Sequence, residues 1–86
     1  MSVLQGLMHQ AEKNGDASAQ LAGGLVVRVS KALDGWRITL ERVRVAPAAH
    51  EVAAVTSAAT ALGWSVHGSG SEESGMLQRK WIRVTR

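Results

Sequence analysis

The chain of 86 residues contains no cysteine, no phenylalanine and no tyrosine, and it has a single proline. Without cysteine, neither a disulfide framework nor a metal site built on thiolates can form. No apolar run approaches the roughly 20 residues that a membrane-spanning helix needs. The start of the chain also lacks the charged segment and long apolar stretch of a signal peptide. We therefore expect a cytoplasmic protein that does not engage a membrane.

Hydrophobic residues make up 45% of the chain, and its formal net charge is +3. This composition differs from that of disordered proteins, and the length allows one domain at most. The positive charge is unevenly distributed, because nine of the ten Lys and Arg residues follow residue 24. A modest basic balance of this kind is compatible with nucleic acid or an acidic partner, and equally with an ordinary solvated surface.

The strongest local pattern is a hairpin over Leu25–Val45 that leads directly into a helix. Asp34-Gly35 predicts its two-residue turn, because a type I′ turn needs positive φ at both central positions. The resulting register gives one apolar face, one polar face and a matched pair of opposite charges across the strands. The predicted pairs are Leu33 with Trp36, Ser30 with Thr39, and Arg28 with Glu41.

The alternation of polar and apolar residues reverses after Glu41. Strict alternation would turn Arg42 and Arg44 toward the apolar face. One extra residue in a strand moves every later side chain to the other face, so we predict a β-bulge near Glu41–Arg42. The bulge would place both arginines beside Arg28 and Arg37 on the polar face.

Two segments have the periodicity of helices. Ser2–Asn14 carries apolar residues along one side and is predicted to be a short amphipathic helix. Pro47–Leu62 has an apolar stripe at helical spacing and ends before Gly63, which is typical of a left-handed cap. Between the first helix and the hairpin, the small and polar segment Asp16–Gly24 predicts a linker.

The remaining segments complete a small α+β fold. Trp64–His67 predicts a short strand, Gly68–Gly75 a flexible loop, and Met76–Thr85 the last strand. The order α-β-β-α-β-β favours a mostly antiparallel four-stranded sheet with the second helix packed on one face. Residues 1–24 are then a short helix plus linker, and residues 25–86 form a single α+β domain.

The face of the sheet away from the helix is predicted to be basic. Arginines supply phosphate contacts, and an exposed tryptophan can stack on an unpaired base. This pattern predicts a small accessory protein that binds nucleic acid non-specifically; a face kept charged for solubility and edge protection is the alternative. The candidate nucleic-acid-binding residues are Arg28, Arg37, Arg42, Arg44, Arg79, Trp81 and Arg83.

No set of residues indicates catalysis. The histidines His9, His50 and His67 are far apart in sequence, which argues against a metal site. No nucleophile, base and orienting group are brought together by any motif. We therefore predict a protein that is not an enzyme and needs no cofactor or metal. A small enzyme using His50 or His67 beside an acid is the weaker alternative.

A second class of function is a protein–protein interaction module. The helix Pro47–Leu62 carries only one charged residue, Glu51, and Ser2–Asn14 must dock on some apolar surface. These features are typical of a homodimer that regulates or inhibits a larger partner, and this hypothesis is compatible with nucleic-acid binding.

Overall fold

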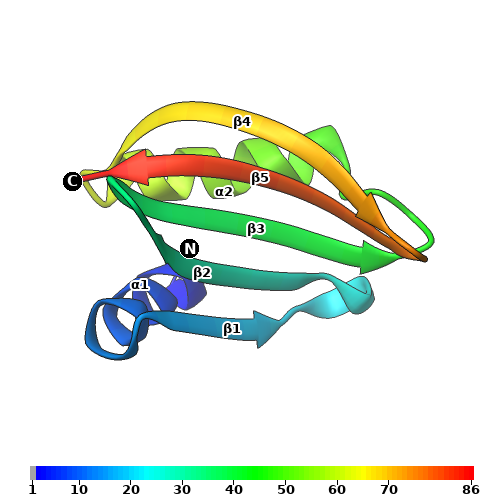
Figure 1. Cartoon of the computed structure of the whole chain (residues 1–86), viewed down its shortest axis with the longest axis horizontal. Helices are drawn as coiled ribbons and strands as arrows, with labels where there is room; N and C mark the ends of the chain where they lie inside the picture. Colours follow the sequence, from blue (N-terminus) through cyan, green and yellow to red (C-terminus); the bar gives the residue numbers. More distant parts are fainter. Residues whose placement is uncertain (1) are drawn as a thin grey trace.

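The computed structural model of the chain describes residues 2–86. Two α-helices, five strands and a short 3-10 helix build an α+β fold (Figure 1). The elements are α1 (Ser2–Asn14), β1 (Asp16–Gln20), η1 (Ala22–Gly24), β2 (Val26–Ala32), β3 (Gly35–Val43), α2 (Ala49–Ala61), β4 (Ser65–Ser74) and β5 (Leu77–Thr85). The predicted fold class is therefore confirmed, with five strands in place of four.

All five strands belong to one antiparallel sheet with the order β1-β2-β3-β5-β4. The strand β3 lies at the centre, and β1 and β4 are the two edges (Figure 1). The pairs β1–β2, β2–β3 and β4–β5 join strands that are consecutive in the chain. The pair β3–β5 joins strands that α2 and β4 separate in the chain.

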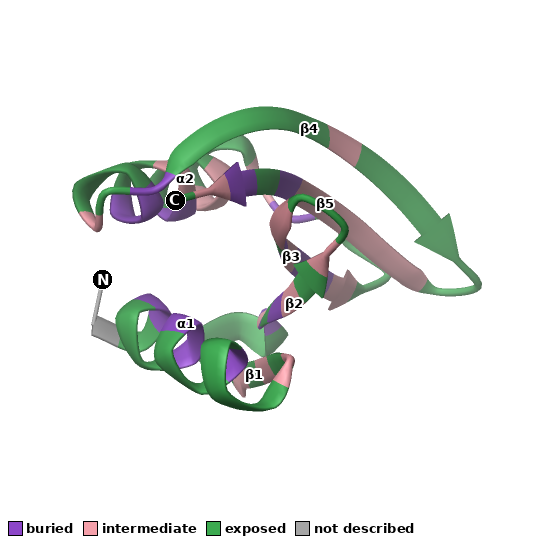
Figure 2. Cartoon of the chain, turned by 60° about the vertical axis from the view of Figure 1, so that its left-hand side comes forward, coloured by how far each residue is buried: buried purple, intermediate pink, exposed green. Residues whose placement is uncertain are grey.

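Both helices pack against the same face of the sheet, which we call the covered face (Figure 2). The opposite face carries no helix, and we call it the open face. Removing apolar side chains from water is the main force that holds the helices there. The buried core residues are Leu4, Leu7, Met8, Ala11, Leu25, Val27, Val29, Ile38, Leu40, Val55, Ala58, Ala59, Trp64, Ile82 and Val84.

The two helices form where their periodicity predicts them. The bounds of α1 are those expected, while α2 begins at Ala49, two residues after Pro47. Ala48 is the N-cap residue, so the proline precedes the helix instead of occupying its first turn. Gly63 has a φ of 88°, which confirms the left-handed residue expected after the second helix. Neither helix within residues 2–86 has the length and apolar character needed to cross a membrane.

The hairpin of β2 and β3 forms, but its predicted register is wrong by two residues. Ala32 pairs with Gly35, so Leu33 and Asp34 make the loop, and neither has a positive φ. Gly35 is needed for a different reason, because a Cβ at this position would overlap the carbonyl oxygen of Val84. A shift of two residues leaves the paired side chains of β2, and those of β3 up to Glu41, on their predicted faces.

The predicted bulge near Glu41–Arg42 is also wrong. β3 pairs residue by residue with β5 from Trp36 to Val43. Arg42 therefore stays on the covered face, where α2 supplies an acidic partner, and Val43 ends the strand half-exposed on the open face. The register shift of this sheet lies instead in β4, between Val66 and Gly68.

The segment predicted as a linker contains the edge strand β1. Ala17 and Ala19 pack against the core, and they alternate with exposed Asp16, Ser18 and Gln20. Their methyl groups are small, so the sequence has little of the apolar signal that marks a strand. Pairing with β2 supplies the backbone hydrogen bonds that hold β1 in place.

The segment predicted as the loop Gly68–Gly75 is mostly strand. β4 pairs with β5 along its length, and Gly75-Met76 forms the two-residue turn between them. Gly75 has a φ of 62°, which favours glycine. Nine of the ten residues in β4 are exposed, so this strand needs no apolar side chains.

Candidate nucleic-acid interface

The sheet places five of the seven candidate residues on the open face. Residues that lie directly opposite each other in paired strands share a face. In this register, Arg37 lies opposite Arg83, and Thr39 lies between Arg28 and Trp81. The candidates on the open face are Arg28, Arg37, Arg79, Trp81 and Arg83.

Trp81 lies between a glycine of β4 and an arginine of β3. Gly70 is its direct partner, and a Cβ at Gly70 would overlap the indole ring. On this face the guanidinium carbon of Arg37 lies 4.5 Å from the centroid of the ring. Such a cation–π contact contributes about 0.5–1 kcal/mol at an exposed site. The ring and the guanidinium thus form a stack on the surface of the sheet.

Glu41 is a buried acid on the open face, with 7% of its surface exposed. Arg28 lies 3.3 Å from one carboxylate oxygen, and the Nε of Arg79 donates to the other at 2.9 Å. The predicted contact of Arg28 with Glu41 therefore forms, although the two residues are diagonal neighbours in the sheet. This shared carboxylate compensates one of the two positive charges and holds both arginines in place.

Arg37 and Arg83 are exposed and form no ion pair within residues 2–86. Acids on the open face outside the Glu41 cluster lie toward the edges, with Asp16 on β1 and Glu72 on β4. Positive charge is therefore concentrated around Arg37 and Arg83, next to the indole of Trp81.

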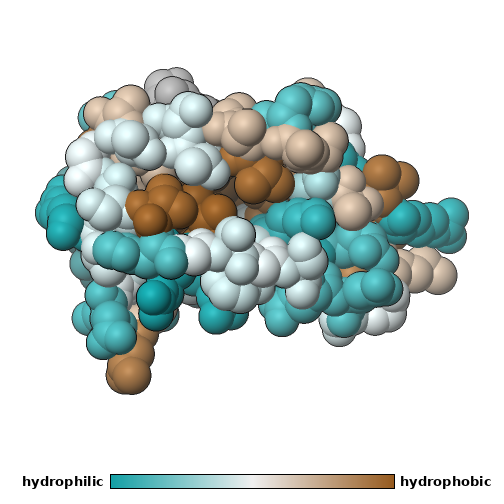
Figure 3. Space-filling model, turned by 90° about the horizontal axis from the view of Figure 1, so that it is seen from above, coloured by the Kyte–Doolittle hydropathy of each residue, from teal (hydrophilic) through white to brown (hydrophobic). Residues whose placement is uncertain are grey.

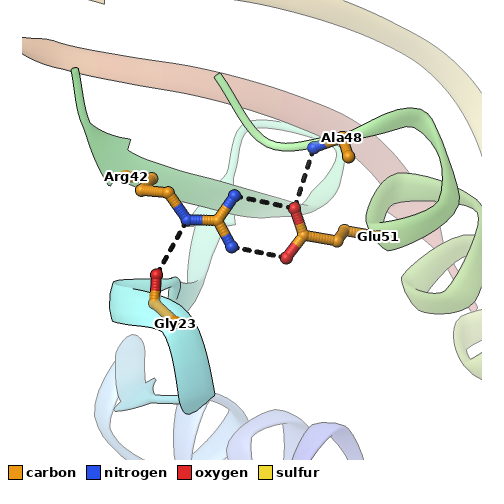
Figure 4. A network of polar contacts seen from close by, with 4 residues as sticks. All are labelled: Gly23, Arg42, Ala48 and Glu51. Atoms are coloured by element: carbon orange, nitrogen blue, oxygen red, sulfur yellow. Dashed lines mark hydrogen bonds and ion pairs between the residues drawn. The ribbon is translucent and has the colours of Figure 1, made fainter. Parts of the chain in front are cut away.

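Arg42 belongs to a different structure on the covered face (Figure 4). Its Nη1 and Nη2 donate to the two carboxylate oxygens of Glu51 at 2.8 and 2.6 Å, and its Nε donates to the carbonyl oxygen of Gly23 at 3.0 Å. The backbone N–H of Ala48 donates to Glu51 Oε1 at 2.8 Å. This network joins η1, β3 and the start of α2, and it corrects the assignment of Arg42 to the basic face.

The same network changes the acidity of Glu51. The hydrogen bonds from Arg42, followed by the one from Ala48, lower the pKa of this carboxyl from 4.5 to about 2. Both donors favour the charged form of the acid. Arg42 is therefore engaged in holding the fold together instead of being available to a ligand.

Arg44 lies beyond the end of β3 and outside the cluster. It has a φ of 72°, which is uncommon for an arginine, and its N–H donates to the carbonyl oxygen of Met76 at 2.6 Å. Its position follows from the regular end of β3, since the predicted bulge that would bring it to the open face does not form.

The sequence patterns missed two features that shape the open face: the position of Gly70 against Trp81 and the contact of Glu41 with Arg79. Gly70 lies in a segment without strand signals, so its pairing with Trp81 could not be predicted. Glu41 and Arg79 are 38 positions apart in the chain. Their contact depends on the β3–β5 pairing, for which no local pattern exists.

The histidines form no cluster. His67 exchanges a hydrogen bond with the hydroxyl of Thr85. Within the described part of the chain, no group of three acidic or histidine side chains is arranged to hold a metal ion. No family model, no curated protein sequence and no solved structure matches this chain.

Proposed function

We propose that the chain is a non-enzymatic accessory protein that binds single-stranded nucleic acid through its open face without reading its sequence. The observation that carries the proposal is the stack of Arg37 on Trp81, beside Arg83, on a sheet face without helices. Arginine contacts phosphates, and planar groups stack on unpaired bases whatever their identity.

The geometry favours a single strand over a duplex. The open face is a wide antiparallel sheet, and its aromatic group lies along the surface above Gly70. A base that is already unpaired can lie on such a surface, whereas the bases of a duplex are stacked on each other. Discrimination between sequences needs hydrogen bonds to base edges. Arginines that contact phosphates provide none, so we expect little sequence preference.

The proposal is tested by fluorescence anisotropy with labelled single-stranded DNA and RNA oligonucleotides of mixed sequence. Binding is expected at low ionic strength and should weaken steeply as salt is added, because displaced counterions are released from the strand. A duplex of the same length is expected to bind more weakly. Absence of binding to every oligonucleotide at low salt would refute the proposal.

Two variants localise the contact. Arg37→Gln is expected to reduce the slope of log K against log salt by about 0.7, the value for one lost phosphate contact on a single strand. Arg86→Gln is the matched control, because Arg86 is also exposed but pairs with Glu12 of α1 at 3.2 Å. Equal weakening by the two variants would show that net charge alone matters.

A further inference from the structure

The strand β4 is a long free edge of the sheet. It has ten residues and pairs with β5 on one side, with His67 left out of the register, and nine of the ten are exposed (Figure 2). A free edge presents unpaired N–H and C=O groups to which another strand can add. The other edge, β1, has only five residues. The edge of β4 is therefore the larger surface available for pairing.

We propose that two copies of this chain pair through β4 in antiparallel fashion, about a twofold axis at Gly70. An interface of this symmetry uses the same patch twice, so the patch must be complementary to itself. In the proposed register, Gly70 lies opposite the second copy's Gly70, and Glu72 lies opposite the second copy's Gly68.

Charge complementarity supports this register. Gly68 is paired with Arg83 on the open face, and it has no side chain that would separate the arginine from an added strand. The carboxylate of Glu72 from the second copy would therefore lie beside Arg83. The twofold axis produces this contact twice. An axis at Ser69 would place Glu72 opposite Val66, and an axis at Ser71 would place it opposite Gly70. Either shift would remove the contact with Arg83.

The centre of the proposed interface is apolar on the open face. The indole of Trp81 extends over Gly70, toward the free edge of the sheet. With Gly70 on the axis, the two indoles approach each other across the strands. Trp81 is half-buried in a single copy, so pairing would remove more of its apolar surface from water.

The covered-face side of the edge presents no opposing charge pair. A groove runs between α2 and β4, and Lys80 is its one charged lining residue within residues 2–86. Its walls include Ala49, Val52 and Ala53 of α2. Figure 3 looks onto this side of the molecule and shows hydrophobic side chains in a hollow bordered by nearly neutral and hydrophilic residues. In the proposed register, Ser69 lies opposite Ser71 here, so hydroxyl groups face each other.

This inference does not depend on nucleic-acid binding, and its test contains no nucleic acid. Paired copies would form one continuous sheet in which both Arg37–Trp81 stacks lie near the axis. Arg83 would then be compensated by the acid of the second copy, while Arg37 would remain available.

The oligomeric state is measured by analytical ultracentrifugation over a wide range of protein concentrations. The native chain is expected to be a dimer. Glu72→Lys is expected to weaken dimerisation on the order of a hundredfold, because it places like charges side by side. A native chain that stays monomeric at the highest concentration would overturn the proposal.

A charge exchange tests the register itself. Arg83→Glu alone is expected to weaken the dimer as Glu72→Lys does, and the double variant Glu72→Lys/Arg83→Glu is expected to restore it. The two positions are too far apart within one copy for an internal contact to explain the rescue. Failure of the double variant to restore the dimer would overturn the register.

The matched control is Glu73→Lys, which makes the same charge change one residue away. Glu73 faces the other side of the sheet, where it accepts a hydrogen bond from Gln78 and, in the proposed register, lies opposite His67 of the second copy and not opposite an arginine. This variant is expected to leave dimerisation within a fewfold of native. Weakening equal to that of Glu72→Lys would overturn the proposed contact. Circular dichroism of every variant establishes that the chain remains folded.

Discussion

Glu41 and Arg42 are neighbours in β3, yet they join ion pairs on opposite faces of the sheet. On the open face, Glu41 lies between Arg28 and Arg79, which reach it from the two flanking strands. On the covered face, Arg42 is held by Glu51, which belongs to α2. The charge of Glu41 is therefore paired by residues of neighbouring strands, whereas the charge of Arg42 is paired by a residue of a helix.

The comparison shows what decides whether a charged residue can remain on a packed face. Arg42 stays there without a bulge because it donates two hydrogen bonds to the carboxylate of Glu51 and one to the backbone carbonyl of Gly23. A partly buried charge is tolerated on a packed face when it is paired and hydrogen-bonded. The face on which a charged side chain of a strand lies thus depends on whether that face offers it partners, and not on the alternation of polar and apolar residues alone.

The two faces are expected to differ most in the free energy of unfolding that is lost when a side chain of β3 is truncated. Ile38 is 1% exposed on the covered face, so Ile38→Ala should lower the free energy of unfolding by about 2–5 kcal/mol through lost burial and a cavity. Thr39→Ala on the open face should change it by only about 0.5 kcal/mol. Urea denaturation of both variants measures the contrast, and similar losses would show that both faces are packed alike.

Removing the charge of Glu41 tests the cluster on the open face. Glu41→Gln is expected to lower the free energy of unfolding by about 1–3 kcal/mol, because the two arginines lose the negative charge that they share and one of its two acceptor oxygens. Glu73→Gln, at an exposed position of β4, is the control and should have an effect within about 0.5 kcal/mol. A neutral result for Glu41→Gln would mean that solvent replaces the carboxylate.

A methyl group at Gly70 tests the stack on the open face. Gly70→Ala would overlap the indole of Trp81, so the ring must move, at a cost of about 1 kcal/mol. Trp81 should then become more exposed, which a red shift of the fluorescence emission would report. Gly68→Ala is the control, since a Cβ at Gly68 has no atom within 4 Å in the described structure. Equal shifts in both variants would contradict the close packing of Trp81.

The smallest expected effect is the pH dependence of the stability that Glu51 contributes on the covered face. Because the folded-state pKa of Glu51 is lowered from 4.5 to about 2, its stabilising contribution is complete above pH 4.5 and is lost as the pH falls toward 2. Glu51→Gln lacks this dependence. The difference in urea midpoint between the native chain and Glu51→Gln should therefore shrink across this range, and a constant difference would contradict the assignment.

The elements with a clear periodicity were predicted well. The limits of α1, the presence of α2 and the strands β3 and β5 follow from where apolar residues recur. The edge strand β1 was missed, and only the beginning of β4 was predicted, within Trp64–His67, because both strands consist mainly of small or polar residues. An edge strand can be stabilised by the backbone hydrogen bonds of its neighbour, and these leave no mark in its own composition.

The candidate interface was also predicted only in part, because local spacing determines some of its residues and distant contacts determine the others. Arg28, Arg37, Arg79, Trp81 and Arg83 share a face because alternation in a strand is a local property. The positions of Arg42 and Arg44 depended on a bulge that was inferred from alternation alone. Nothing in β3 itself indicates that Glu51 lies within reach of Arg42.

The helices, the central strands and the faces of most of their side chains follow from the amino-acid sequence alone, since these depend on spacing along a few residues; Arg42 is the exception in β3. Which charges meet, where the edges of the sheet lie and what covers Trp81 become evident from the folded chain. These features join residues that are distant in the chain, such as Glu41 with Arg79 or Gly70 with Trp81. Their contacts depend on strand pairing, which local propensity does not specify.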